Sequence, residues 1–258
     1  MKILDKIISL FKCSKKDEPI VKKNNISVVI VGMEYSRTFG SCPGAKKDAE
    51  NMRRILSKYT DNITFFTDSE ATRIRVANAL KKAVESDLCI FCYSGHGGSE
   101  RFSDTGSEEK DGKDEFLCLN DNYLRDNDIW KILKTAKGRV VLYFDCCHSS
   151  DMFRTQNPFA MGFGAVGNST ERGMKGQTLY VKDDTVNALV WAGCHESTVS
   201  WGSSAGGKLT NTFVKYFDSG LTYDEIWEKL ANDSSLLRDE IPYRVIIGKP
   251  FGDKKVFC

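Results

Sequence analysis

The chain has 258 residues, of which 41% are apolar and 28% are charged, and its formal net charge is +2. This length fits one large domain or two small ones, with enough apolar side chains for a substantial core. The nearly balanced charge argues against a nucleic-acid-binding protein that relies on a basic surface, and no apolar run reaches membrane-spanning length. The nine cysteines are an odd number without regular spacing, which favours reduced thiols and a cytoplasmic location.

Residues 1–25 are predicted to form a short amphipathic helix followed by a charged linker. Apolar side chains recur at helical spacing within Ile3–Phe11. Asp5 and Lys6 interrupt this run and no small-residue cleavage site follows it, so a signal peptide is not favoured. Three interpretations of the helix stay open: packing against its own domain, contact with a membrane surface or partner, or a disordered lead-in. The folded domain is predicted to span residues 26–258.

Strand and helix signals alternate from residue 26 onward. Short apolar runs predict strands, and apolar residues three and four apart predict helices. The predicted strands are Ile26–Val31, Ile63–Phe66, Leu88–Tyr93, Phe116–Leu119, Arg139–Phe144, Leu189–Ala192, Tyr243–Ile247 and Val256–Phe257. The predicted helices are Asp48–Tyr59, Thr72–Ala83 (with Thr72 as N-cap and Ile74 on the buried side), Asp126–Lys134, Leu209–Phe217 and Tyr223–Leu230. This alternation predicts an α/β protein with a central, mainly parallel sheet and helices on both faces.

Three segments are predicted to be loops. Ser99–Asp114 is rich in charged and small polar residues, and Gly202–Gly207 is rich in Gly and Ser. The third segment, at about residues 148–187, holds five glycines and shows little periodicity. A loop of this length inside a compact domain is usually functional or disordered.

Two polar motifs directly follow predicted strands. Tyr93-Ser94-Gly95-His96-Gly97 ends one strand, and Asp145-Cys146-Cys147-His148-Ser149 ends another. In parallel sheets catalytic groups collect beyond the carboxyl ends of the strands, and neighbouring strands lie about 5 Å apart. The sequence therefore predicts Cys147 as a nucleophile and His96 as its general base and later general acid. The amides of Gly97 and Cys147 are candidate donors to an oxyanion.

Other interpretations of these residues were weighed. Taken alone, Cys147 fits a buried core cysteine and His96 fits a turn histidine, but their joint position after two strands favours a catalytic pair. A structural zinc site is not favoured, because Cys89 and Cys92 are three apart in a predicted strand and would face opposite sides.

The two motifs together resemble the paired signatures of metacaspases and their bacterial relatives, in the caspase-like cysteine peptidase clan. The resemblance extends from about Ile26 to the C-terminus and implies a three-layer αβα sandwich with a central, mainly parallel sheet. The second cysteine of the family motif is the nucleophile, and it matches Cys147. The resemblance also implies cleavage of proteins or peptides after Arg or Lys, with the basic side chain bound by Asp48, Ser94 and Asp145.

The resemblance raises calcium as an activator, although the peptidase chemistry itself requires no cofactor. Asp114 and Asp126 match two of the family's calcium-binding positions. Asn127 and Arg154 stand where further Asp residues are expected, and hard cations favour several carboxylates. A solvated acidic surface is the alternative interpretation of these aspartates.

The sequence therefore predicts a cytoplasmic, monomeric cysteine endopeptidase with specificity for Arg or Lys. In this clan the segment after the nucleophile is often cut during activation, so a zymogen that processes itself within residues 148–187 is expected. Two alternatives stay open: a catalytically silent caspase-like scaffold, and a related peptidase with a different primary specificity.

Overall fold

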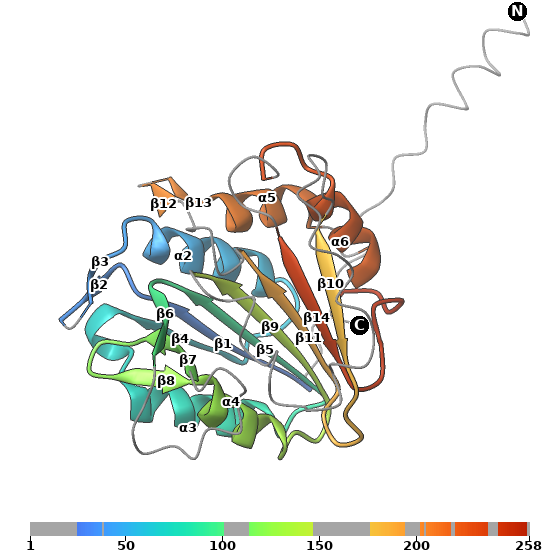
Figure 1. Cartoon of the computed structure of the whole chain (residues 1–258), viewed down its shortest axis with the longest axis horizontal. Coiled ribbons are helices and arrows are strands. Elements are labelled where there is room, and N and C mark those ends of the chain that lie inside the picture. Colours follow the sequence, from blue (N-terminus) through green and yellow to red (C-terminus); the bar gives the residue numbers. More distant parts are fainter. Residues whose placement is uncertain are drawn as a thin grey trace, which may run out of the picture.

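The computed structural model describes residues 25–37, 39–100, 114–146, 176–193, 202–203, 205–217, 220–236 and 242–256. In these residues a seven-stranded sheet lies between two groups of helices, which gives three layers (Figure 1). The predictions for residues 1–24 and for Cys147 lie outside the described residues, as does most of the predicted loop at 148–187.

The central sheet has the strand order β10-β14-β11-β9-β5-β1-β4. Its strands are β1 (Ile26–Gly32), β4 (Ile63–Thr67), β5 (Leu88–Ser94), β9 (Arg139–Asp145), β10 (Gln177–Val181), β11 (Ala188–Ala192) and β14 (Tyr243–Ile247). The five strands from β4 to β11 are parallel, β14 is antiparallel to β11, and β10 is parallel to β14. All residues of β1 and β5 are buried, as expected for parallel strands covered on both faces.

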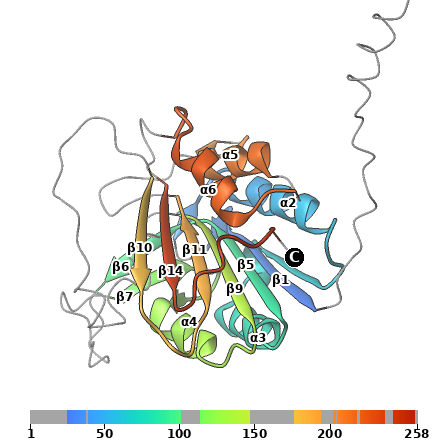
Figure 2. The same cartoon turned by 90° about the vertical axis from the view of Figure 1, so that its right-hand side faces the viewer.

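Helices cover both faces of the sheet (Figures 1 and 2). One face is covered by α3 (Arg73–Ala83) and α4 (Asp126–Leu133), and the other by α2 (Ala45–Leu56), α5 (Lys208–Tyr216) and α6 (Tyr223–Ala231). Alternate strand residues contribute to two separate cores: Val29 and Val31 to the first, Val28 and Ile30 to the second. The α/β fold class, with its mainly parallel sheet in an αβα sandwich, is therefore confirmed.

Smaller elements extend from the edge of the sheet where β1 and β5 end. The strands β6 (Gly97–Glu100), β7 (Asp114–Cys118) and β8 (Tyr123–Arg125) form a three-stranded antiparallel sheet. Two hairpins are made by β2 (Tyr35–Ser36) with β3 (Gly40–Ser41), and by β12 (Gly202–Ser203) with β13 (Gly206–Gly207). A 3-10 turn at Asp68–Glu70 precedes α3. Apart from β7, these strands were not predicted, because two to four residues are too few for a periodic pattern.

Several predicted elements need correction. The segment Gln177–Val181 is the strand β10, although it falls inside the predicted loop at 148–187. The strand β10 lies at the edge of the sheet and pairs with a single neighbouring strand. Its side chains therefore need not all be apolar and buried, and Tyr180 is 59% exposed. Val256, predicted as the start of a strand, lies in a turn.

Two helix predictions also need correction. Ile74 is 69% exposed, whereas Val76 is buried. Two residues of α-helix turn by roughly 200°, so these side chains point to opposite sides of α3. Thr72 occupies the N-cap of α3 but its side chain makes no capping hydrogen bond. The helix α2 begins at Ala45, directly after Gly44, and not at Asp48.

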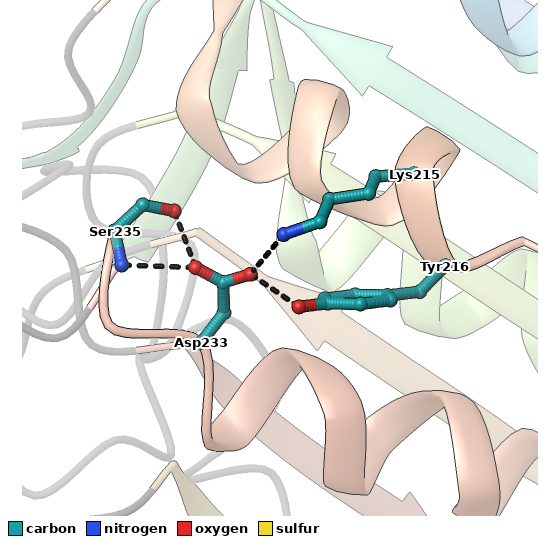
Figure 3. Close-up of polar contacts among 4 residues, drawn as sticks. All are labelled: Lys215, Tyr216, Asp233 and Ser235. Atoms are coloured by element: carbon teal, nitrogen blue, oxygen red, sulfur yellow. Dashed lines mark hydrogen bonds and ion pairs between the residues drawn. The ribbon is translucent and has the colours of Figure 1, made fainter.

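The end of α5 is joined to the turn after α6 by one carboxylate (Figure 3). Asp233 accepts hydrogen bonds from Lys215 Nζ at 3.0 Å and from Tyr216 Oη at 2.6 Å. It also accepts from the hydroxyl of Ser235 at 2.5 Å and from its amide at 2.9 Å. The hydroxyls of Ser235 and Tyr216 hold the pKa of Asp233 below its usual range, and Lys215 adds to this. We call these four residues the Asp233 clasp.

Within the described residues, no helix is both long and apolar enough to traverse a lipid bilayer.

Candidate active site

The ends of three neighbouring strands bring the two motifs together. In the register of the sheet, Gly32 of β1 pairs with Ser94 of β5, and Ser94 pairs with Asp145 of β9. The pairing continues past β5, because the amide of Gly95 donates to the carbonyl of Asp145 at 3.3 Å. The histidine motif and the Asp145 end of the cysteine motif therefore lie side by side at one edge of the sheet.

His96 is partly exposed, and one of its ring nitrogens contacts the backbone of β3. The distance from His96 Nε2 to the carbonyl oxygen of Ser41 is 2.9 Å. A carbonyl oxygen can only accept a hydrogen bond, so Nε2 must carry the proton in this arrangement. In the neutral ring Nδ1 then carries no proton. A general base requires such an unprotonated nitrogen. Ser41 was not predicted, because a backbone carbonyl leaves no signal in the side-chain pattern.

The backbone of His96 is held from beneath by a buried tyrosine. The hydroxyl of Tyr93 donates to the carbonyl of His96 at 2.6 Å and lies 2.8 Å from the carbonyl of Cys118. The amide of Cys118 also donates to the carbonyl of His96, at 3.0 Å. These contacts fix the position of the His96 main chain between β5 and β7.

A cluster of buried polar side chains lies next to these strand ends. Asp48 is 2% exposed and accepts from Ser94 Oγ at 2.9 Å. The amide of Gly207 donates to both oxygens of the same carboxylate, at 2.8 and 3.0 Å. Asp145 is 4% exposed and accepts from Thr210 through its amide at 3.1 Å and its hydroxyl at 2.7 Å. The structure thus brings together Asp48, Ser94 and Asp145, the three residues that the resemblance assigns to substrate binding.

Asp48 reaches this cluster because α2 packs closely on β1. A Cβ atom at Gly32, the last residue of β1, would lie 2.6 Å from Ala49 Cβ, so only glycine permits this contact. Asp48 shares the buried side of α2 with Ala45, Ala49 and Met52.

The electrostatics of Asp48 are unusual for a carboxylate. Burial raises its pKa from 3.8 to about 7, and the nearby charge of Asp145 adds to this, while the hydrogen bonds from Gly207 and Ser94 act in the opposite direction. A cavity of only about 10 Å³ adjoins Asp48, which is room for about one water molecule at most. A cationic neighbour would lower the pKa of this carboxyl group, because an opposite charge favours its ionised form.

The prediction missed the residues that hold these carboxylates. Gly207, at the N-cap of α5, and Thr210, in its first turn, are contributed by a segment more than sixty residues beyond Asp145 in the chain. The sequence signal for them was the run Gly207-Lys208-Leu209-Thr210, which matches the family and opens a helix but does not indicate what it contacts.

The predicted calcium ligands lie at one end of the small sheet. Asp126 begins α4, is fully buried, and accepts from the amide of Asn127 at 2.7 Å. Asp114 begins β7, and the pairing of Phe116 with Arg125 places it at the same end of the sheet, although its side chain is outside the described part. Over the described ranges, no group of three or more acidic, His or Cys side chains gathers as a metal site. Calcium binding stays a prediction.

The remaining predicted residues are placed in part. Gly97 opens β6 and pairs with Leu117, and its role toward an oxyanion stays a prediction. Cys146, the last described residue of the cysteine motif, is fully buried. Cys147 follows it in the sequence and lies outside the described residues, so its role stays a prediction.

Comparisons with known proteins show the family of the chain. A family described as "Caspase domain" matches residues 26–239. Metacaspase-1A of Aspergillus fumigatus is 23% identical over 272 aligned positions, which cover 83% of this chain and 65% of that protein. Metacaspase-1B of Neurospora crassa is 28% identical over 142 positions, or 47% of this chain and 33% of that protein. The chain therefore spans less than two thirds of the length of these relatives.

Two solved structures share the fold. Protein GSU0716 from Geobacter sulfurreducens has a TM-score of 0.69 and 20% identity, covering 90% of this chain and 98% of that one. Caspase-1 from Spodoptera frugiperda has a TM-score of 0.55 and 11% identity, covering 90% and 94%. Since the family match covers most of the chain, including both motifs and α5, this protein belongs to the caspase domain family.

Proposed function

We propose that this protein is a cysteine endopeptidase that cleaves polypeptides after Arg or Lys, with Cys147 as nucleophile and His96 as general base and acid. The observation that carries this proposal is the pairing of Ser94 with Asp145 at the ends of neighbouring strands. His96 and Cys147 each follow one of these paired residues by two positions in the sequence. Paired strand positions lie about 5 Å apart, which favours contact between an imidazole and a thiol that follow them so closely.

In the proposed reaction His96 accepts the thiol proton of Cys147 at Nδ1, because Nε2 is bound to the carbonyl of Ser41. The thiolate attacks the scissile carbonyl carbon, and the amides of Gly97 and Cys147 hold the resulting oxyanion. His96 then gives its proton to the leaving amine, so that the peptide bond breaks and a thioester remains. A water molecule, deprotonated by His96, hydrolyses the thioester and restores the free thiol.

The specificity for Arg or Lys is supported by the two buried carboxylates. Both donors to Asp48 are neutral groups, the Ser94 hydroxyl and the Gly207 amide. Asp145 lies near enough for its charge to raise the pKa of Asp48. A guanidinium or ammonium group bound beside these carboxylates would relieve this repulsion, whereas an acidic substrate side chain would add to it. Its entry would require the cavity of about 10 Å³ next to Asp48 to widen.

Cleavage of fluorogenic peptides tests this proposal. We expect turnover of peptides that end in Arg or Lys before the reporter group, and none of those that end in Asp or Leu. Cys147→Ala should abolish turnover, whereas Cys89→Ala, which removes a buried thiol within β5, should retain it. Undiminished cleavage by the Cys147→Ala variant would contradict the assignment.

Self-processing between Cys147 and β10 is part of this proposal. The segment contains Arg172 and Lys175, among other basic residues. A cut there would leave Asp48 and Asp145 on one fragment and Thr210 on the other. The pairing of β9 with β11 would keep the two fragments associated. Intact-mass measurement of the active enzyme should show two fragments, and the Cys147→Ala variant should stay whole. An uncut active enzyme would contradict self-processing alone.

Activation by calcium through Asp114 and Asp126 completes the proposal. Cleavage of an Arg-terminated peptide should increase with added Ca²⁺ and fall with a chelator, and Asp126→Asn should weaken this response. Equal rates with Ca²⁺ and chelator would exclude calcium as an activator without affecting the proposed peptidase activity.

A further inference from the structure

We propose that the first turn of α5 sets the preference between Arg and Lys, with Thr210 as the positioning residue that orients the Asp145 carboxylate. This inference rests on the proposed peptidase function, and it assigns a role to residues outside the two motifs. It starts from the observation that one helical turn holds carboxylates from two different elements, Asp48 of α2 and Asp145 of β9.

Thr210 binds one oxygen of Asp145 twice. Its amide donates to Asp145 Oδ2 at 3.1 Å and its hydroxyl donates to the same oxygen at 2.7 Å. The hydroxyl of Tyr143 donates to Thr210 Oγ1 at 3.4 Å, so the single hydroxyl proton of Thr210 is directed to Asp145. Two donors on one oxygen fix the rotation of the carboxylate, and hence the direction in which its charge is presented.

The N-terminal end of α5 is suited to holding carboxylates. The first amides of a helix have no partner within the helix, and its N-terminus carries partial positive charge. The amide of Gly207, at the N-cap, serves Asp48, and the amide of Thr210, two residues after the first helical position, serves Asp145. The helix α5 thus holds both carboxylates through neutral groups, the amides of Gly207 and Thr210 and the hydroxyl of Thr210.

The close contact requires two successive glycines. A Cβ atom at Gly207 would collide with the carboxylate of Asp145, and one at Gly206 would collide with that of Asp48. Gly206 also has a φ of +100°, which other residues rarely adopt. The hairpin before α5 is therefore shaped around the two carboxylates.

Carboxylate orientation affects Arg and Lys differently. A guanidinium is a planar fork that pairs with a carboxylate through two parallel hydrogen bonds, so its binding depends on the rotation of the carboxylate. An ammonium is a compact charge with rotatable donors and tolerates a reoriented carboxylate better. A loss of the Thr210 hydroxyl should therefore weaken Arg recognition more than Lys recognition.

The test compares Thr210→Val with the parent enzyme on matched Arg- and Lys-terminated fluorogenic peptides. We expect KM for the Arg peptide to rise about tenfold or more, since a hydrogen bond to a charged group is lost. The rise for the Lys peptide should be about threefold or less, and kcat should change little for both. Thr210→Ser, which keeps the hydroxyl, should restore the parent KM values and the preference for Arg.

Thr212→Val is the matched control, because Thr212 is a buried threonine of the same helix and, in the described part of the chain, is not among the hydrogen-bond donors to Asp48 or Asp145. It should leave both KM values unchanged. Gly207→Ala is an independent variant, because the added methyl group would displace the Asp145 carboxylate. It should also lower the preference for Arg, and it tests the proposal if Thr210→Val does not fold.

The outcomes separate the two proposals. Equal losses for Arg and Lys in Thr210→Val, or a fall in kcat alone, would overturn the positioning role while leaving the peptidase assignment intact. If the parent enzyme cleaves neither peptide, the proposed function is wrong and this inference is wrong with it.

Discussion

Asp48 and Asp233 are buried carboxylates in two regions of the molecule, and they are held in opposite ways. Both are nearly inaccessible, at 2% and 8% exposure, and both accept several hydrogen bonds. In the Asp233 clasp the donors include an ammonium group and two hydroxyls, and the pKa of Asp233 lies below its usual range (Figure 3). In the cluster of Asp48, Ser94 and Asp145, which we call the candidate pocket, the donors to Asp48 are a hydroxyl and an amide. Asp145 lies nearby, and the pKa of Asp48 is raised to about 7.

The difference separates a structural carboxylate from one that we propose binds the substrate. The clasp supplies its own cation, Lys215, and joins two helices with it. The pocket holds two like charges together, an arrangement that is unfavourable for the free protein and favourable once a cation is bound. A basic side chain of the substrate would then stabilise the ionised form of Asp48, as Lys215 stabilises that of Asp233.

The largest expected effect is the loss of cleavage after Arg and Lys in Asp48→Asn. This change removes one of two charges that face the basic side chain in a site of low dielectric, so kcat/KM for an Arg peptide should fall at least about 100-fold. Steady-state kinetics measure this. Asp233→Asn is the control and should change kcat/KM by less than about threefold. Similar losses in both variants would remove the distinction between the two carboxylates.

The pH dependence of KM should be the next largest effect. Asp48 has a pKa of about 7 in the free pocket, so it takes up a proton as the pH falls below this value and its attraction for a cation is lost. KM for an Arg peptide should therefore rise about tenfold between pH 8 and pH 6. The Asp48→Asn variant should lack this rise. A KM that is constant from pH 8 to pH 6 in the parent enzyme would contradict the raised pKa.

The two carboxylates should also affect stability with opposite sign at pH 8. The raised pKa of Asp48 means that the native state binds more protons than the unfolded chain between about pH 4 and 7, so its contribution is largest at low pH and is lost as the pH rises through 7. Asp48→Asn should therefore raise the free energy of unfolding at pH 8 by about 1–3 kcal/mol.

Asp233 behaves in the opposite way, because its pKa is lowered and its contribution is present at neutral pH and lost only in acid. Asp233→Asn should lower the free energy of unfolding at pH 8 by about 2 kcal/mol. Urea denaturation of both variants measures the two changes. Destabilisation of equal size in both would show that Asp48 is an ordinary structural carboxylate.

The smallest effect is expected for Lys215→Ala. The Lys215 side chain is 62% exposed, so solvent screens its ion pair with Asp233. The free energy of unfolding should therefore fall only slightly. Tyr216→Phe, which removes a hydroxyl from the same carboxylate, should have a larger effect. The reverse order would mean that charge, and not hydrogen bonding, dominates the clasp.

The sequence was sufficient for the parallel core of the fold. Strands β1, β5 and β9 are short, continuous apolar runs whose ends carry the motif residues, and the register at Ser94 and Asp145 agrees with this prediction. The edge strand β10 was missed because a strand with a single neighbouring strand does not require a continuous run of apolar residues. Ile74 was misplaced because apolar spacing near a helix start does not fix which side is buried.

The candidate pocket could be predicted only in part. Asp48, Ser94 and Asp145 were assigned to substrate binding through the family resemblance. The strand ends predict that Ser94 and Asp145 meet, whereas nothing in the local pattern brings Asp48 to them. The carbonyl of Ser41 and the amides of Gly207 and Thr210 are backbone groups, so residue types do not reveal them. Their roles follow from distances between segments that are far apart in the chain.

We propose that Cys147 and His96 act together beside a binding site for a basic side chain. Covalent labelling by a peptidyl acyloxymethyl ketone that ends in Arg tests this pairing, with the modified residue located by mass spectrometry. We expect an adduct on Cys147 in the parent enzyme. The adduct should form at least about 100-fold more slowly in His96→Ala, and also with the matching Asp-terminated probe. Modification of another cysteine, or labelling of Cys147 at equal rates by both probes, would contradict it.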